Sequence, residues 1–174
     1  ALEARAAGLI CLTGGAEGPL GLELVAGHEA EATALADRLG RAFGDRLYVE
    51  LTRHGTGETG LTEAEAAAEP GLISLAYAKG LPLVATNHIQ FEDPSMFEAH
   101  DALICIGEGR YVNESDRRML TPEHHFKTAE AMAERFADLP EAIEMTAEVA
   151  LRCAVRPRTH APILPRFARS GEHT

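Results

Sequence analysis

The sequence has few basic residues, few cysteines and no long apolar run. It holds 16 Lys and Arg against 27 Asp and Glu, so its formal net charge is −11. Such a surface repels a phosphate backbone, and we do not expect this chain by itself to bind nucleic acid strongly. The longest apolar stretches, such as GLICLTGG and ALICIG, are far shorter than the roughly 20 residues that span a bilayer. With no secretory signal either, we expect a cytoplasmic protein without a membrane partner.

Several catalytic patterns are also missing. Cys11, Cys105 and Cys153 are scattered without CxxC spacing, and we expect reduced, buried or half-buried thiols. There is no GxSxG motif and no cysteine at a recognisable nucleophile elbow, so nothing indicates nucleophilic catalysis. The stretch LTGGAEGPLG follows neither GxGxxG nor the P-loop pattern, because it lacks the lysine and hydroxyl that phosphates and magnesium need.

What remains is an alternation of apolar strands and amphipathic helices. Strands are predicted at 8–15, 46–52 and 81–86, and helices at 28–44, 61–80, 93–106, 121–139 and 140–154. Strands that alternate with helices predict an α/β fold with parallel strands, either a layered sheet or part of a barrel. Three strands are too few to close a barrel alone.

Local signals support the helix boundaries. Thr62 and Glu65 fit a capping box. Asp93 is predicted as an N-cap, with Pro94 at the first helical position. Pro70 either lies in the first turn of a helix or kinks a longer one. The acidic run TEAEAAAE, residues 62–69, is most simply a solvated helix face.

Polar residues follow each predicted strand. They are Gly14, Gly15 and Glu17, then Arg53, His54 and Gly55, then Asn87, His88 and Gln90. Loops that follow parallel strands share one edge of the sheet, where α/β proteins place their sites. His54 and His88 could therefore share a zinc, manganese or iron ion. No carboxylate lies beside His88, however, and a hydrogen-bonded or solvated loop histidine is the commoner outcome.

The other histidines give weaker signals. His124 and His125 are adjacent, so they point in different directions from a helix, whereas metal-binding pairs on one helix use i, i+4 spacing. We expect a structural or surface role for both. His100 is expected to pack or hydrogen-bond within its helix.

Six stretches in order carry a resemblance. They are GLICLTGG, RLYVELTRHG, AYAKGLPLVATNHIQF, FEAHDALICIGEGR, RRMLTPEHHFKTAEAMAERFADLPEAIEMTAEVALRC and APILPRF. Together they resemble the second half of the PHP (polymerase and histidinol phosphatase) domain of bacterial DNA polymerase III alpha subunits, from about Gly8 to Phe167. The resemblance implies that residues 1–160 are part of a distorted seven-stranded β/α barrel, mainly helical in the C-terminal half. Residues 161–174 would then be a linker toward the polymerase palm.

The resemblance also bears on the metal site. Family members with a metal centre carry an Asp-x-His pair where this chain reads ATNHIQF, so His88 replaces the aspartate and Gln90 the histidine. His54 matches a family metal ligand. The HxH motif of the first barrel half is absent. The resemblance thus implies that His54 and His88 are remnants of a degraded metal site, and that this piece has no catalytic residue and no cofactor.

For function, the resemblance implies a fragment of a replicative DNA-directed DNA polymerase, with Mg2+ expected only in the absent palm. This piece would be a structural, inactive module that contacts the palm and thumb. The proofreading subunit, the sliding clamp and DNA would be reached through the parent protein. The alternative is a metal-dependent phosphoesterase or 3′–5′ proofreading nuclease with Zn2+ or Mn2+. A third reading, an independent binding module, would be favoured if removal of residues 161–174 were tolerated.

Overall fold

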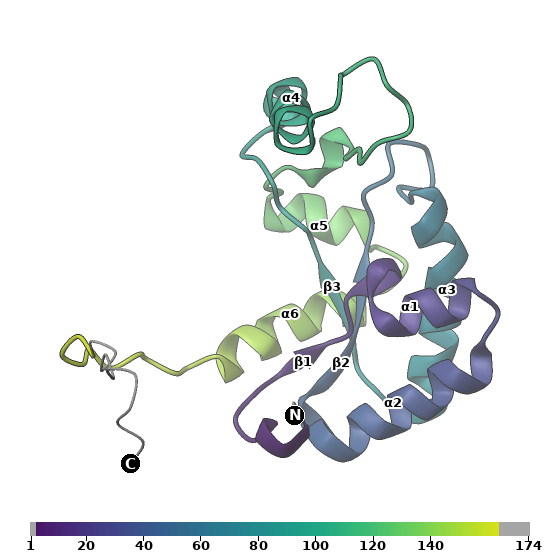
Figure 1. The fold of residues 1–174 in the computed structure, drawn as a ribbon. Coiled ribbons are helices and arrows are strands. Elements are labelled where there is room, and N and C mark those ends of the chain that lie inside the picture. Colours follow the sequence, from purple (N-terminus) through teal and green to yellow (C-terminus); the bar gives the residue numbers. More distant parts are fainter. Residues whose placement is uncertain (1–2, 164–174) are drawn as a thin grey trace, which may run out of the picture.

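Three parallel strands form the centre of the structure, a computed structural model that describes residues 3–163. Their order is β1-β2-β3 (Figure 1), and their bounds are Cys11–Leu12, Leu47–Thr52 and Leu83–Thr86. Leu12 pairs with Tyr48, and Val49 pairs with Leu83. The predicted parallel arrangement is confirmed. The first strand is much shorter than expected, because the chain turns at Gly14 and Gly15, whose φ angles of 83° and 57° favour glycine.

Helices connect and cover the strands. The α-helices are α1 (Pro19–Val25), α2 (Glu29–Phe43), α3 (Glu63–Lys79), α4 (Phe97–Glu108), α5 (Ala129–Arg135) and α6 (Pro140–Arg152). Short 3-10 turns are η1 (Glu3–Arg5), η2 (Gly15–Glu17), η3 (Gly44–Arg46), η4 (Pro94–Met96) and η5 (Pro122–His124). Helix α2 leads into β2, and α3 connects β2 to β3, as the alternation predicts. Helix α1 was not predicted, because its sequence lies in a glycine-rich stretch.

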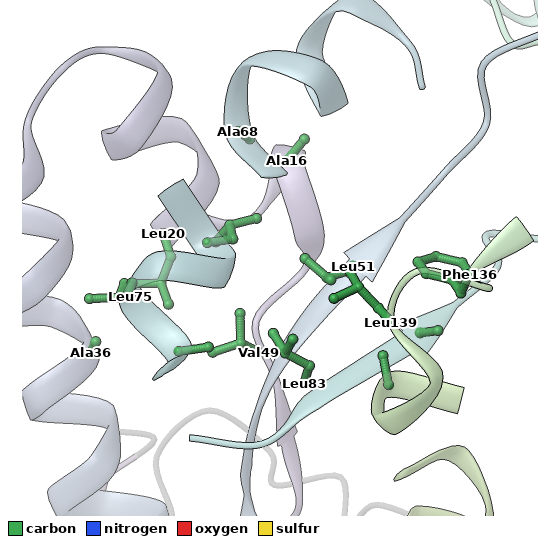
Figure 2. Packing of buried hydrophobic residues seen from close by; sticks show 14 residues of the cluster. Ala16, Leu20, Ala36, Val49, Leu51, Ala68, Leu75, Leu83, Phe136 and Leu139 are labelled. Carbon is green, nitrogen blue, oxygen red and sulfur yellow. The ribbon is translucent and has the colours of Figure 1, made fainter. Parts of the chain in front are cut away.

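The core lies where helices from both halves of the chain meet the strands. Figure 2 shows Val49, Leu51 and Leu83 between Leu75 of α3 on one side and Phe136 on the other. Figure 1 places α6 against β3, on the side away from α1 and α2. Burying a large apolar side chain stabilises a fold by roughly 1.5–3 kcal/mol, so this cluster holds the strand ends in fixed positions.

Two of the predicted helix starts are confirmed, those at Thr62 and Asp93. Thr62 and Glu65 form the capping box of α3. Asp93 accepts a hydrogen bond from the Ser95 backbone at 2.8 Å and caps η4, which leads directly into α4. Pro70 lies inside one continuous helix, so the alternative in which it opens a helix is wrong.

The single helix predicted over 121–139 is wrong. After η5, the chain runs extended beside the segment that follows β3. The backbone of Gln90 donates to His124 O at 2.8 Å, and Phe126 donates to Phe91 O at 3.0 Å. Helix α5 begins only after Thr128, whose side chain caps it. Backbone groups that pair with a neighbouring segment are not free to form the hydrogen bonds of a helix. This pairing explains why residues 124–126 are not helical.

The sheet is open. Within residues 3–163 its three strands do not close on themselves, as expected for so few strands. No helix of the described part is long and apolar enough to cross a membrane. Cys105 is buried and Cys11 half-buried, but Cys153 is exposed, contrary to expectation. Of the predicted linker, residues 161–163 are exposed and without regular structure, and residues 164–174 lie outside the described residues.

Candidate functional site

The loops after the three strands meet around one cavity of about 560 Å³. Five of the residues predicted for this edge line it: Gly14, Glu17, His54, Asn87 and His88. The convergence of the three loops is therefore confirmed. The cavity is also lined by residues that the sequence did not single out for it, which are Glu65, Thr121 and His124 among others.

His54 is held at both ring nitrogens. Its side chain is buried, and Nδ1 lies 2.8 Å from Oε1 of Glu65 in the first turn of α3. Its Nε2 accepts a hydrogen bond from the backbone nitrogen of His88 at 3.1 Å. A neutral imidazole has one N–H donor and one lone pair. Nδ1 thus donates to the carboxylate, Nε2 accepts from the backbone, and no lone pair remains for a metal.

Glu65 does not belong to a solvated helix face as expected. It is only 6% exposed, and its carboxylate accepts backbone hydrogen bonds from His54 at 2.9 Å and Thr62 at 2.8 Å. Burial by itself raises the pKa of Glu65. The hydrogen bonds from the His54 ring and from the two backbone groups outweigh burial and lower the pKa to about 2. Glu65 is therefore a charged acceptor that fixes the His54 ring.

His124 is part of the site, although it was expected to be structural or on the surface. Its ring stacks on His54 with centroids 4.1 Å apart. Its Nδ1 lies 3.2 Å from the backbone nitrogen of Thr121, the cap of η5. Burial and the nearby His54 ring lower the pKa of His124 to about 4, so the ring is neutral at pH 7. The helix-spacing rule missed this residue, because its neighbour in space lies far away in the sequence.

His88 is engaged by Gln90. The amide nitrogen of Gln90 lies 2.7 Å from Nε2 of His88, which places an N–H donor on that lone pair. Gln90 itself does not line the cavity. No group of three or more His, Cys, Asp or Glu side chains within the described ranges is arranged to hold a metal ion. The side chains at this edge do not fit the Zn2+ or Mn2+ centre that the nuclease alternative requires.

Glu50 joins all three strands. Its Oε2 accepts from the backbone of Gly14 at 2.8 Å, and its Oε1 accepts from the Thr86 hydroxyl at 2.6 Å. The Glu50 backbone in turn donates to the Thr13 hydroxyl at 3.0 Å. Since these partners lie at the ends of β1 and β3, the Glu50 carboxylate is a crosslink between strands in the lining of the cavity.

Arg53 does not line the cavity, although it was expected at this edge. It is buried and binds both carboxylate oxygens of Glu69 and both of Asp138 at 2.7–2.9 Å. Its guanidinium also lies over the Phe136 ring, 4.6 Å from the centroid. The bond to Asp138 and then the bond to Glu69 raise the pKa of Arg53 despite burial. Arg53 thus ties the end of β2 to α3 and to the turn before α6.

These features define a class: an open, parallel α/β unit with a polar cavity at the carboxyl edge of its strands, whose imidazoles are held by protein groups. No protein-family model matches the chain. The DNA polymerase III subunit alpha of Caulobacter vibrioides is 50% identical over 160 residues, which is 92% of this chain and 14% of that protein. The subunits of Rickettsia bellii and Neisseria meningitidis serogroup A are each 41% identical over 161 residues.

Over almost its whole length, the chain is homologous to one segment of bacterial DNA polymerase III alpha subunits. It spans 13–14% of the length of these curated relatives.

Proposed function

We propose that this chain is a structural, non-catalytic part of the PHP domain of a replicative DNA polymerase, the DNA polymerase III alpha subunit. The observation that carries the proposal is the double engagement of His54, whose Nδ1 bonds Glu65 at 2.8 Å and whose Nε2 bonds the His88 backbone at 3.1 Å. An imidazole whose two nitrogens are both hydrogen-bonded to protein groups stabilises the ends of β2 and β3. The identity of 50% to a polymerase subunit supports the assignment to the parent protein.

In this proposal, residues 1–160 are the second part of a β/α barrel and residues 161–174 lead toward the palm. The open sheet supports it, because unpaired strand edges require further strands or cover. The palm and thumb of the same protein are the direct partners. The proofreading subunit, the sliding clamp and DNA are reached through the parent, which agrees with the net charge of −11. The Mg2+ for nucleotide transfer belongs to the palm.

The nuclease alternative needs a metal-bound water with a lowered pKa and an open coordination position. The lone pair of His54 is occupied by a backbone N–H, and that of His88 by the Gln90 amide. Neither side chain offers the metal a nitrogen without first breaking a protein hydrogen bond, so the geometry does not favour this alternative.

The test compares the complete alpha subunit that carries this segment with its His54→Ala variant. Metal content is measured by elemental analysis after incubation with Zn2+ and Mn2+, together with 3′–5′ nuclease activity and primer extension. We expect equal metal content in both proteins, no nuclease activity, and a variant that melts earlier but extends primers at low temperature. A His28→Ala variant, altered at an exposed histidine, is the control. Near-stoichiometric metal that disappears in His54→Ala would contradict the proposal.

A further inference from the structure

Helix α4 turns an apolar stripe toward solvent. Ala99, Leu103 and Ile106 lie at helical spacing on one face, and Met96, directly before the helix, extends that face. Leu103 is 64% exposed, Ile106 is 77% exposed and Met96 is 44% exposed, and Ala99 is exposed as well. A surface helix of a globular protein normally buries such a stripe against the core. These four residues, the α4 stripe, are uncovered within residues 3–163.

A buried ion pair fixes which face of α4 points outward. Asp101 and Cys105 lie on the inward face and are 7% and 3% exposed. The two carboxylate oxygens of Asp101 accept hydrogen bonds from the Arg117 guanidinium at 2.6 and 2.7 Å. Turning the stripe inward would break this two-pronged pair and expose its partners one by one, which is costly for buried charges. The outward orientation of the stripe is therefore held by contacts of the chain itself.

Helix α4 also stands apart from the rest of the fold. Figure 1 shows it at a distance from the three strands, and among the described elements it packs most closely against the short turn η4. A helix of 12 residues is marginal in water unless an apolar face packs against something. The exposed stripe thus indicates a further contact that residues 3–163 do not supply.

A second copy of this chain is a poor occupant of the stripe. A specific interface between separate proteins takes about 20–30 residues on each side, whereas the stripe consists of four side chains. Two copies would also each bring a net charge of −11, so they repel one another.

A segment of the same polypeptide meets both conditions. The chain spans only 14% of the length of the Caulobacter vibrioides relative, so most of such a parent lies outside these residues. A tethered segment has an effective concentration in the millimolar range, and a small contact area is then sufficient. The two exposed charged side chains of α4, Glu98 and Glu108, are both acidic. Basic residues beside an apolar face would complement them.

We propose that the α4 stripe is the docking surface for an amphipathic helix of the same polymerase polypeptide, outside these 174 residues, whose apolar face is bordered by Lys and Arg. Leu103 and Ile106 pack into that apolar face, and the basic residues lie near Glu98 and Glu108. The inference rests on the proposed function in one respect, namely that this chain is a structural part of a longer polymerase subunit.

The test is photo-crosslinking in the complete alpha subunit, with p-benzoyl-L-phenylalanine placed at Leu103. We expect crosslinks within one polypeptide, to a helical segment outside these 174 residues in which Lys and Arg outnumber Asp and Glu. Adding Ile106→Glu should lower the yield of this crosslink at least about fivefold, because a carboxylate would be buried without a partner. Ile106→Leu keeps the apolar surface and should leave the yield unchanged. The same crosslinker at Glu98, which lies on a different side of α4, should give the crosslink in lower yield.

Four results would overturn the inference: a crosslinked species of twice the subunit mass, crosslinks confined to these 174 residues or to an acidic segment, no crosslink from Leu103, and a yield that Ile106→Glu leaves unchanged. Primer extension by each variant shows that the subunit is folded. Metal content and nuclease activity are measured separately, so a failure of the docking inference and a failure of the proposed structural role are distinguishable.

Discussion

The backbone nitrogen of His88 donates a hydrogen bond to Nε2 of His54 over 3.1 Å, and Nδ1 of the same ring lies 2.8 Å from Glu65. One buried imidazole thereby connects the end of β2, the end of β3 and the first turn of α3. A residue that the sequence resemblance predicts to be a remnant metal ligand acts here as a crosslink between secondary-structure elements. Its importance for stability can be measured without any ligand.

Replacing His54 by alanine should destabilise the fold by about 2–4 kcal/mol, because Glu65 would be left as a buried carboxylate without its side-chain partner. In a chain of this size, the melting temperature should fall by about 2–4 °C per kcal/mol. Thermal unfolding followed by circular dichroism, with EDTA present, measures the change. The control is His28→Ala, which removes an exposed pair with Glu23 and should change stability by less than about 1 kcal/mol. Equal melting temperatures of His54→Ala and His28→Ala would contradict the role of His54 as a crosslink.

Arg53→Met should cost about 3–5 kcal/mol, because it leaves the buried Glu69 carboxylate unpaired. A second change, Glu69→Leu, should recover much of that loss by removing the uncompensated charge. The double-mutant cycle is measured by urea unfolding. Arg38→Met, which breaks an exposed pair with Glu3, is the matched control and should change stability by less than about 1 kcal/mol. If Arg53→Met lowered the free energy of unfolding by no more than Arg38→Met, the buried pair would contribute little to stability.

Glu50→Ala should destabilise the chain by about 1–3 kcal/mol, since it leaves the Gly14 backbone and the Thr86 hydroxyl without their acceptor. Glu50→Gln keeps one acceptor oxygen and should cost less. Hydrogen exchange of the Gly14 amide, measured by NMR, should accelerate in both variants. Glu148→Ala, at an exposed position of α6, serves as the control for Glu50→Ala. Unchanged protection of Gly14 in Glu50→Ala would exclude the crosslink between strands.

Stability should fall on acidification in two overlapping steps. The pKa of His124 is lowered from 6.5 to about 4 in the folded chain, so the unfolded chain binds more protons between these values. Stability is therefore complete above pH 6.5 and declines toward pH 4. The pKa of Glu65 is lowered from 4.5 to about 2, so its contribution is complete above pH 4.5 and is lost toward pH 2.

Urea unfolding across this range measures both steps. A His124→Asn variant should lose the upper step and keep the lower one. The upper step is expected to amount to no more than about 3.4 kcal/mol. A wild-type chain whose stability is flat between pH 6.5 and pH 4 would show that His124 titrates normally.

Local sequence determined much of the framework. Helix periodicity and cap residues act over three or four positions, so the capping box of Thr62 and Glu65 and the start at Asp93 could be predicted. The alternation of strands and helices determined the parallel sheet, and with it the meeting of His54 and His88 at one edge. The order of the motifs also indicated the relation to polymerase alpha subunits.

The tertiary structure alone decided which polar groups are buried and what they bind. Glu65 and Glu69 have the sequence pattern of a solvated helix face, yet burial selected them as partners of His54 and Arg53. His124 stacks on His54 although they are far apart in the chain. Such contacts depend on how distant segments pack, and no local pattern encodes them. The change of His54 from candidate ligand to crosslink is therefore a property of the folded chain.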